Sequence, residues 1–352
     1  RRLAIVDLSP QGEQPMVSAC GRYVIVFNGE IYNHLALRQD LGPLPWRGHS
    51  DTETLLACIS RHGVQHALAL FVGMFAFALW DTQKLTLTLA RDRMGEKPLY
   101  YGRLPVGDLV FGSELKALRA HPSWQGTIDR EALAQYMRHN VIPAPRSIHQ
   151  GISKLEPGCW IEFQVGGDVR HGRYWDLRDV AMDAHAAAPA WSDTEAVTRL
   201  RALVDQSVRD QMIADVPLGA FLSGGVDSSA IVASMCRQSS GKVRTFSIGF
   251  AESGFDEAVY ARAVASHLGT DHTELYVTPA DALAVIPGLA SIYDEPLAHS
   301  SQIPPVLVSR MARRDVTVAL SGDAGDELFA GYNRDLLADE LWRRLGAGPL
   351  PL

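Results

Sequence analysis

One short loop constrains this chain more than any other feature: Ser-Gly-Gly-Val-Asp-Ser-Ser at residues 223–229. A strand-like run at residues 218–222 precedes the loop, and a helical pattern begins at about Ser228. Glycines allow a sharp turn that brings backbone N–H groups close to an anion, and a helix N-terminus adds positive potential. The loop therefore predicts a phosphate site; the alternative is a turn whose Asp and Ser side chains cap a helix. Because a carboxylate repels phosphate, we expect Asp227 to hold Mg²⁺, which prefers oxygen ligands.

A second, acidic loop at residues 321–327 supports this interpretation. It follows another β-rich run, residues 316–320, and carries Asp323, Asp326 and Glu327 together with two glycines. Three carboxylates in so short a stretch suit a metal or substrate loop, although a solvated acidic turn has the same composition. Ligands of α/β sheets bind beyond the carboxyl ends of the strands, so two such loops indicate one composite site.

The pattern around these loops predicts the fold of the second half. Residues 192–352 alternate strands and helices, which is typical of an α/β doubly wound, mostly parallel sheet. The expected strands are 218–222, 245–250, 274–277 and 316–320, and the expected helices include 256–268, 280–293 and 302–313.

The first half has a different pattern, in which short strands with helices beside them predict an α+β layered domain over residues 1–165. The expected strands are 23–27, 75–80, 85–90, 99–102 and 109–112, and the expected helices are 31–39, 51–62 and 129–138. Asn28-Gly29, a turn signal, closes the first of these strands. The glycine- and alanine-rich stretch 166–191 predicts a linker between the domains.

Composition limits the partners and the compartment. The net charge of −7 argues against a nucleic-acid partner, which usually requires a basic face. The four cysteines form no CxxC pair, as is common in a reducing cytosol. The longest apolar run, residues 68–80, is shorter than the roughly 20 residues that span a bilayer. We expect a cytoplasmic protein with no membrane and no nucleic-acid partner, and a homodimer is left open.

Several motifs carry a resemblance to a known family. The loop at 223–229 resembles the pyrophosphate-binding loop of N-type ATP pyrophosphatases. With Ser-Ile-Gly-Phe at 247–250 and LSGDAGDELFAGY at 320–332, it resembles the synthetase domain of glutamine-hydrolysing asparagine synthetases. The resemblance covers nearly the whole chain and keeps the family's motif order. It implies an ATP-pyrophosphatase domain over residues 192–352 that is incomplete at its C-terminus.

The resemblance also implies the roles of individual residues in this domain. Asp323 would be the catalytic residue beside the adenylated carboxylate, and Asp227 and Asp326 would be the Mg²⁺ ligands. The residues implied to bind ATP lie in both loops and in the strand between them: Leu222, Ser223, Gly224, Gly225, Asp227, Ser228, Ile248, Ser321 and Gly322.

Three motifs in the first half resemble the class II glutaminase domain of the same family, which has an Ntn-type fold: RLAIVD at 2–7, NGEIYN at 28–33 and GHSDTE at 48–53. Arginine can clamp an α-carboxylate, acidic side chains can bind an α-ammonium, and an Asn side chain with a Gly N–H can form an oxyanion hole. The residues expected to bind glutamine are Arg2, Asn28, Gly29, Glu30 and Asp51. The alternatives are a hairpin turn at Asn28-Gly29 and a helix cap at Ser50-Asp51.

The nucleophile of this family is an N-terminal cysteine, whereas this chain opens at Arg1. We therefore expect a chain truncated at both ends, in which residues 1–165 lack their N-terminal start and do not hydrolyse glutamine.

For the whole protein the resemblance implies an ATP-dependent carbon–nitrogen ligase. Glutamine releases ammonia, ATP with Mg²⁺ converts aspartate to β-aspartyl-AMP, and ammonia displaces AMP, giving asparagine, glutamate, AMP and pyrophosphate. The acceptor-side segment, residues 294–305, departs from many relatives at His299 and Pro305, although His299 also fits a solvent-facing loop residue. Two alternatives therefore stay open: an amidotransferase that acts on a sugar acid or β-lactam precursor, and a non-catalytic nucleotide- or glutamine-binding fragment.

Overall fold

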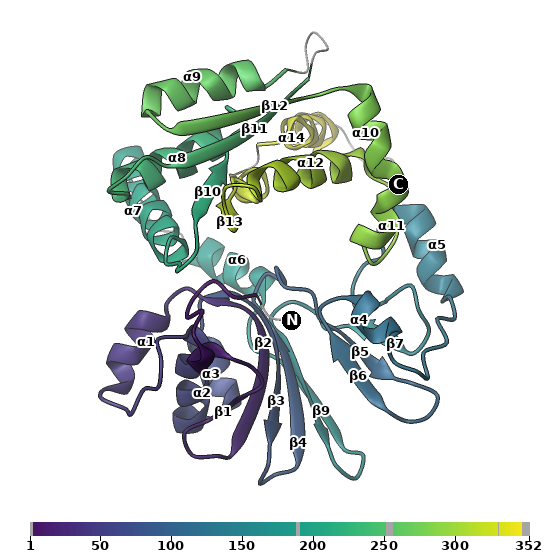
Figure 1. The fold of residues 1–352 in the computed structure, drawn as a ribbon. Helices are drawn as coiled ribbons and strands as arrows, with labels where there is room; N and C mark the ends of the chain where they lie inside the picture. The colour runs from purple at the N-terminus through teal and green to yellow at the C-terminus, as the bar shows by residue number, and fades with distance from the viewer. Residues whose placement is uncertain (1–2, 188–190, 251–255, 330, 347–352) are drawn as a thin grey trace. The chain divides into compact units, whose positions relative to one another are not determined.

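The computed structural model describes residues 3–187, 191–250, 256–329 and 331–346 (Figure 1). The chain divides into two compact units. The first unit comprises Arg1–Ala196, Ile213–Asp215 and Ala284–Gln302, and the second comprises Val197–Met212, Val216–Leu283 and Ile303–Leu352. Two short segments far along the chain thus belong to the first unit.

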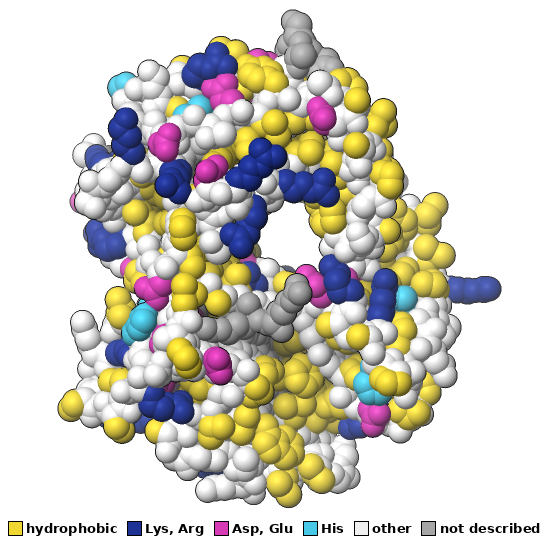
Figure 2. Space-filling view, viewed as in Figure 1, with side chains coloured by type: hydrophobic (Ala, Val, Ile, Leu, Met, Phe, Trp, Pro, Cys, Tyr) yellow, Lys and Arg dark blue, Asp and Glu magenta, His cyan; other side chains and the backbone are white. Residues whose placement is uncertain are grey.

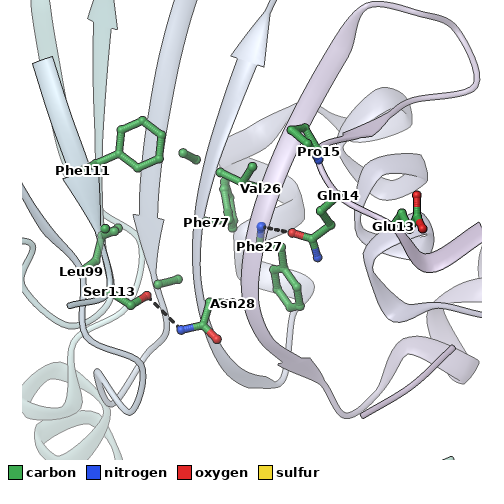
Figure 3. A pocket seen from close by; sticks show the side chains of 13 residues that line it. Glu13, Gln14, Pro15, Val26, Phe27, Asn28, Phe77, Leu99, Phe111 and Ser113 are labelled. Carbon is green, nitrogen blue, oxygen red and sulfur yellow. Dashed lines mark hydrogen bonds between the residues drawn. The ribbon is translucent and has the colours of Figure 1, made fainter. Parts of the chain in front are cut away.

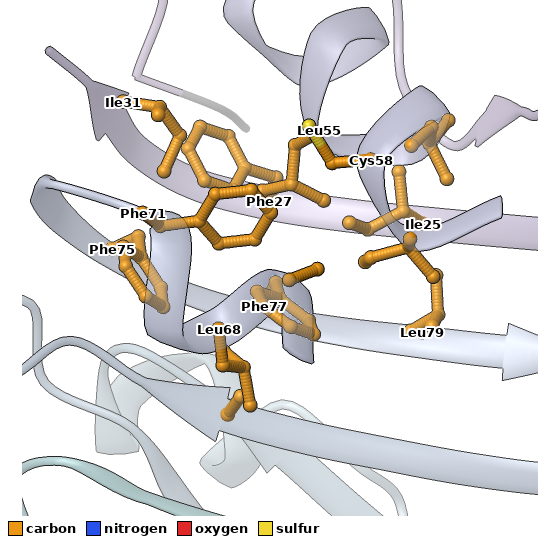
Figure 4. Packing of buried hydrophobic residues seen from close by; sticks show 14 of the residues in the cluster. Ile25, Phe27, Ile31, Leu55, Cys58, Leu68, Phe71, Phe75, Phe77 and Leu79 are labelled. Carbon is orange, nitrogen blue, oxygen red and sulfur yellow. The ribbon is translucent and has the colours of Figure 1, made fainter. Parts of the chain in front are cut away.

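The first unit is built on a six-stranded antiparallel sheet in the order β1-β2-β3-β4-β8-β9. The strands are β1 Met16–Val17, β2 Tyr23–Ile31, β3 Gly73–Asp81, β4 Thr86–Arg91, β8 Cys159–Gln164 and β9 Val169–Arg173. One face of β2 and β3 packs against α1 His34–Leu41, α2 Asp51–His62 and α3 Val64–Leu70. Aromatic and aliphatic side chains fill this core, among them Phe27, Leu55 and Phe77 (Figure 4).

The predicted turn at Asn28-Gly29 is wrong, because both residues lie inside β2 opposite Ala76 and Phe75. Gly29 is required there by close approach of the neighbouring strand: a Cβ at this position would lie 2.1 Å from the carbonyl oxygen of Met74. The strand continues to Ile31, so the helix expected from residue 31 begins only at His34.

A second, three-stranded sheet of the first unit has the order β6-β5-β7. Its strands are β5 Tyr100–Arg103, β6 Leu109–Gly112 and β7 Ile152–Lys154, and α4 Leu115–Arg119 and α5 Arg130–His139 pack nearby. Residues 284–302 add the short helices η2 Ile286–Gly288, α11 Leu289–Ile292 and η3 Ser300–Gln302. The stretch 166–191, expected to be a linker, contains β9, which pairs with β8, and α6 Leu177–Ala186. The domain boundaries given from the sequence stay a prediction.

The second unit has a parallel four-stranded sheet, as predicted, in the order β12-β11-β10-β13. Its strands are β10 Leu218–Phe221, β11 Arg244–Phe250, β12 Asp271–Val277 and β13 Val318–Leu320. The helices are α7 Asp193–Gln211, α8 Val226–Gln238, α9 Ala258–Leu268, α10 Pro279–Val285, α12 Ile303–Ala312, α13 Gly325–Phe329 and α14 Asn333–Gly346. Helices cover both faces of the sheet: α7–α9 share one hydrophobic cluster with β10, and α12 shares another with Phe246 of β11.

The strand order places the functional loops. The chain adds β11 and β12 on one side of β10, and then adds β13 on the other side. The order therefore reverses between β10 and β13, and such a switch point opens a crevice at the carboxyl ends of the strands. Across the described ranges, no helix is long and apolar enough to cross a membrane.

Candidate functional site

The first loop leaves β10 at its carboxyl end and leads directly into α8. Leu222 is buried at the base of the loop, where its N–H donates to the carbonyl oxygen of Phe246 at 2.9 Å. Gly224 has a φ of +80°, and a Cβ there would lie 2.6 Å from the backbone nitrogen of Ala261. The loop is thus pressed against the start of α9, and only glycine fits at this position.

Serine hydroxyl groups hold the loop in shape. The buried hydroxyl group of Ser228 accepts from the N–H of Ser223 at 3.2 Å and lies 2.9 Å from the hydroxyl group of Ser223, which itself accepts from the N–H of Gly225. Gly225 is the N-cap residue of α8, and no described side chain caps this end of the helix. Asp227 is therefore not the helix cap, and the first N–H groups of a 13-residue helix are directed toward the loop.

The second loop contacts the first. Because β13 runs parallel to β10, with Leu320 opposite Ala220, both loops leave the same end of the sheet. A Cβ on Gly322 would lie 2.6 Å from the backbone nitrogen of Ser228, and a Cβ on Gly325 would lie 2.4 Å from the carboxylate of Asp227. The two glycines therefore let the second loop lie against the first, and the structure brings together the two loops that the sequence predicts.

The acidic side chains of the second loop have different surroundings. Asp323 accepts a hydrogen bond from the Ser321 hydroxyl group at 3.0 Å. Glu327 accepts one from the Tyr332 hydroxyl group at 2.5 Å, which lowers the pKa of Glu327. The Asp326 carboxylate lies against Gly331, where a Cβ would approach it to 1.9 Å.

The two loops carry carboxylate oxygens, the kind of ligand that Mg²⁺ prefers. No group of three or more His, Cys, Asp or Glu side chains in the described part of the chain could form a complete metal cage. Mg²⁺ does not need one, since it is commonly held by one or two carboxylates and by substrate phosphates. Asp227, beside the second loop, is a suitable donor.

Ile248 lies at the same end of the sheet. On β11 it is two residues beyond Phe246, which pairs with Phe221, the last residue of β10. Its position beside the first loop suits backbone contact with a nucleotide base.

The candidate glutamine pocket is centred on the end of β2. Asn28 and Glu30, two residues apart, share one face of the strand. Asp51 begins α2, and one of its carboxylate oxygens accepts from the N–H of Ile31 at 2.9 Å. Ser50 is the N-cap of α2 and accepts from the N–H of Glu53, so the helix-cap alternative also holds. Arg2 lies outside the described residues.

Glu30 has unusual electrostatics. Its side chain is 3% exposed, and within the described ranges its Oε1 atom has no hydrogen-bond partner. Burial, and then the neighbouring charge of Asp51, raises the pKa of Glu30 to about 8. Lys97 opposes this shift, and burial in turn lowers the pKa of Lys97. A cation placed at this oxygen would satisfy it and restore the ionised carboxylate.

Asn28 also faces a cavity of about 550 Å³ in the first unit (Figure 3). Its Nδ2 atom donates to the Ser113 hydroxyl group at 2.9 Å, and across the cavity Gln14 accepts from the N–H of Phe27 at 2.7 Å. The remaining walls are mostly apolar, including Val26, Leu99 and Phe111 (Figure 3). Hydrophobic side chains also gather on the surface over the strands of this unit, shown in yellow in the lower part of Figure 2.

Sequence reasoning missed the role of Ser113 and Lys97. No local signal in the sequence around either residue indicates an interaction with Asn28 or Glu30. Only the folded chain brings these pairs together, since Ser113 is 85 residues from Asn28.

An antiparallel unit followed by a parallel unit with a glycine loop at its switch point is the architecture expected of a glutamine amidotransferase domain joined to an ATP-pyrophosphatase domain. Family models agree with this assignment. A glutamine amidotransferase domain matches residues 1–175, and an asparagine synthase domain matches residues 199–350. The chain belongs to the family of glutamine-hydrolysing asparagine synthetases.

Individual relatives support the assignment. The chain is 37% identical to asparagine synthetase [glutamine-hydrolyzing] 1 of Bacillus subtilis, over 99% of this chain and 54% of the relative. It is 36% identical to a putative asparagine synthetase [glutamine-hydrolyzing] 2 of Methanocaldococcus jannaschii, over 94% of this chain and 66% of the relative. A protein named amidase chyE from Penicillium rubens is 31% identical, over 98% of this chain and 53% of the relative.

The chain therefore spans about half to two thirds of the length of these relatives. Our expectation that the chain lacks glutaminase activity finds no support in the comparisons, because the glutamine amidotransferase model matches residues 1–175.

Proposed function

We propose that the full-length protein containing these residues is a glutamine-hydrolysing asparagine synthetase. It would use ATP to adenylate the side-chain carboxylate of aspartate, and ammonia released from glutamine would displace AMP. The observation that carries this proposal is the contact between the two loops at the switch point, where Gly322 and Gly325 lie against Ser228 and Asp227. A loop that only binds phosphate would not need an acidic loop beside it. Adenylation requires that the nucleotide and the acceptor carboxylate be held close together.

In the second unit, the backbone of the first loop would bind the pyrophosphate part of ATP. The first N–H groups of α8 are directed toward the loop, and the hydroxyl groups of Ser223 and Ser228 hold the loop in the required shape. Leu222, Ile248, Ser321 and Gly322 would surround the rest of the nucleotide. Asp227 and Asp326 would hold Mg²⁺, which neutralises phosphate charge when bound. Asp323 would lie beside the adenylated carboxylate as the catalytic residue.

In the first unit, Glu30 and Asp51 would bind the α-ammonium of glutamine, and Arg2 would bind its α-carboxylate. The ammonium would supply the cation that the buried Oε1 atom of Glu30 lacks. Asn28 and the N–H of Gly29 would stabilise the oxyanion formed when the amide is attacked. The hydrogen bond from Asn28 to the Ser113 hydroxyl group would hold the side-chain amide in place for this task.

Another carboxylate is the second candidate acceptor. His299, on the acceptor-side segment, is exposed, and its ring nitrogen lies 2.5 Å from the Ser301 hydroxyl group. A histidine in place of the aspartate of many relatives changes the charge available to the acceptor, and one relative bears the name of an amidase.

Exchange of labelled pyrophosphate into ATP tests the proposal. Labelled pyrophosphate can enter ATP only by reacting with an adenylated acceptor, so exchange reports reversible adenylation. With the full-length protein and Mg²⁺, exchange should depend on aspartate. Exchange with another carboxylic acid and none with aspartate would replace aspartate as the acceptor. Substituting Asp227→Ala should abolish exchange with either acid, and retained exchange would remove Asp227 from the Mg²⁺ site.

A further inference from the structure

A network of polar side chains joins β11 and β12 to α9, which lies beside these two strands (Figure 1). His272 of β12 is at its centre, with a side chain that is only 10% exposed. Its Nδ1 atom lies 2.8 Å from the Thr245 hydroxyl oxygen, and its Nε2 atom lies 3.2 Å from the Ser247 hydroxyl oxygen. Both of these residues belong to β11 and are buried. One imidazole ring thus holds two positions of the neighbouring strand.

An acidic side chain connects His272 to α9. The Nε2 atom of His272 also lies 3.4 Å from Oε1 of Glu274, whose side chain is 16% exposed. Arg262 of α9 pairs with both carboxylate oxygens of Glu274, through Nε at 2.8 Å and Nη2 at 2.5 Å. These hydrogen bonds lower the pKa of Glu274, and burial lowers the pKa of His272. At neutral pH an ionised carboxylate therefore links an uncharged imidazole to a guanidinium, and the bidentate pair fixes α9 at this point.

Tyr276 extends the network toward the start of α9. Its hydroxyl group accepts from Nη2 of Arg262 at 3.2 Å and donates to the Asp256 carboxylate at 3.2 Å. Its ring lies over Gly249 of β11, where a Cβ would approach the ring to 2.7 Å. A side chain at residue 249 would displace the tyrosine, so this close approach requires glycine.

The network holds the backbone that we assign to the nucleotide base. Ser247, which lies against the His272 ring, is the residue before Ile248. Gly249, which the ring of Tyr276 covers, is the residue after it. The backbone of Ile248 is therefore held on both sides by side chains of β12, and a change in the network would move it.

The same network supports the phosphate loop. Arg262 follows Ala261 in α9, and a Cβ on Gly224 would lie 2.6 Å from the backbone nitrogen of Ala261. The pair between Arg262 and Glu274 thus fixes the turn of α9 against which the first loop is pressed. The base segment at Ile248 and the phosphate loop at Gly224 therefore depend on one set of hydrogen bonds, all of it within the second unit.

We propose that His272, Glu274 and Arg262 are positioning residues that hold two segments of the second unit, residues 223–229 and 247–249, in place for ATP. The part of this inference that concerns ATP rests on the proposed function. Such residues act on the shape of the nucleotide site before any ligand arrives, so their effect is measurable in the protein without nucleotide.

The positioning residues are separate from the reacting groups. Within the described ranges, none of their side chains hydrogen-bonds to Asp227 or Asp323. They would therefore stabilise bound ATP equally before and during adenylation, and their loss would change the affinity for ATP rather than the rate of the reaction.

Amide hydrogen exchange of the full-length protein without nucleotide is the first measurement. His272→Ala leaves Ser247 and Glu274 without the imidazole, so exchange in residues 223–229 and 245–250 should accelerate about tenfold. Exchange in β13 should stay within about twofold of the unsubstituted value. An equal acceleration in β13 would overturn the inference, because it would show that His272 only stabilises the unit as a whole.

Calorimetric titration with ATP and Mg²⁺ is the second measurement. His272→Ala should raise the Kd for ATP about tenfold, while the kcat of pyrophosphate exchange stays within about twofold. His272→Gln should raise the Kd by no more than about threefold, because the glutamine amide can donate from about the position of Nε2. Equal losses of affinity in the two variants would overturn the inference, because they would show that packing rather than hydrogen bonding matters here.

His267→Ala is the matched control, because His267 is an exposed histidine in the last turn of α9. It should leave both measurements within about twofold of the unsubstituted values. If His272→Ala does not fold, Arg262→Gln decides the question, since the Arg262 side chain is 56% exposed and its substitution opens no cavity in the core. Arg262→Gln should accelerate exchange in residues 223–229 by about threefold, and no acceleration would overturn the inference.

Failure of the proposed function has a different signature. In that case the unsubstituted protein neither binds ATP nor exchanges pyrophosphate, whereas hydrogen exchange without nucleotide still shows whether His272 positions residues 223–229. If the unsubstituted protein binds ATP and His272→Ala changes neither the exchange nor the Kd, the inference fails and the proposed function stands.

Discussion

The buried carboxyl group of Glu30 lowers the free energy of unfolding near neutral pH, and one substitution should remove this loss. Its ordinary pKa is 4.5, and burial in the folded chain raises the pKa to about 8. Below about pH 4.5 the carboxyl group is neutral in both the folded and the unfolded chain. Between these values the unfolded chain ionises while the folded chain keeps the proton, so the free energy of unfolding falls as pH rises toward 8.

The magnitude follows from the width of this window. Each pH unit corresponds to about 1.4 kcal/mol, so at pH 7 the cost of Glu30 reaches about 3 kcal/mol. Glu30→Gln is neutral at every pH and should therefore be more stable than the unsubstituted chain by up to ~3 kcal/mol at pH 7, with little difference at pH 4.5. The same substitution removes the charge proposed to bind the α-ammonium, so it should weaken glutamine binding by about tenfold or more.

Urea unfolding followed by tryptophan fluorescence measures the effect, because six of the seven tryptophans belong to the first unit. The control is Glu131→Gln, since the Glu131 side chain is 75% exposed. It should show no comparable gain between pH 4.5 and 7. An equal stability difference for Glu30→Gln at both pH values would refute the reasoning, because it would show that the carboxylate is not desolvated.

Further predictions concern the close approaches. Gly29→Ala should destabilise the first unit by several kcal/mol or prevent folding, because its Cβ would lie 2.1 Å from a backbone oxygen of β3; thermal unfolding measures this. Gly322→Ala should separate the two loops and weaken ATP binding, measured by calorimetry, whereas Gly241→Ala meets no atom within 4 Å and serves as the control for both. Chelation of Mg²⁺ should weaken ATP binding to the unsubstituted protein but cause no further loss in Asp227→Ala; a further loss would point to a different Mg²⁺ site.

Local motifs were sufficient to predict much of the second unit. The alternation of strands and helices indicates a parallel sheet, and each glycine-containing loop follows its strand directly in sequence. The expectation that the loops of residues 223–229 and 321–327 meet is confirmed by the approach of Gly322 to Ser228. This succeeded because the carboxyl ends of parallel strands share one edge of a sheet, whatever their separation along the chain.

Local motifs misled where burial decided the conformation. Asn28-Gly29 is a strong hairpin signal in isolation, yet pairing with β3 and the core beneath it keep β2 extended through both residues. The free energy that favours a local turn is small compared with the stabilisation from nine paired positions of β2 and β3 and from burial of one face of the strand.

The glycine loop at residues 223–229 and the family resemblance were determined by sequence alone, because both depend on contiguous residues. Tertiary structure alone decided the burial that raises the pKa of Glu30, the contact of Ser113 with Asn28, and the capping of α4 by Asp294 from 179 residues away. These features depend on desolvation and on contacts between distant segments, and neither quantity exists until the chain has folded.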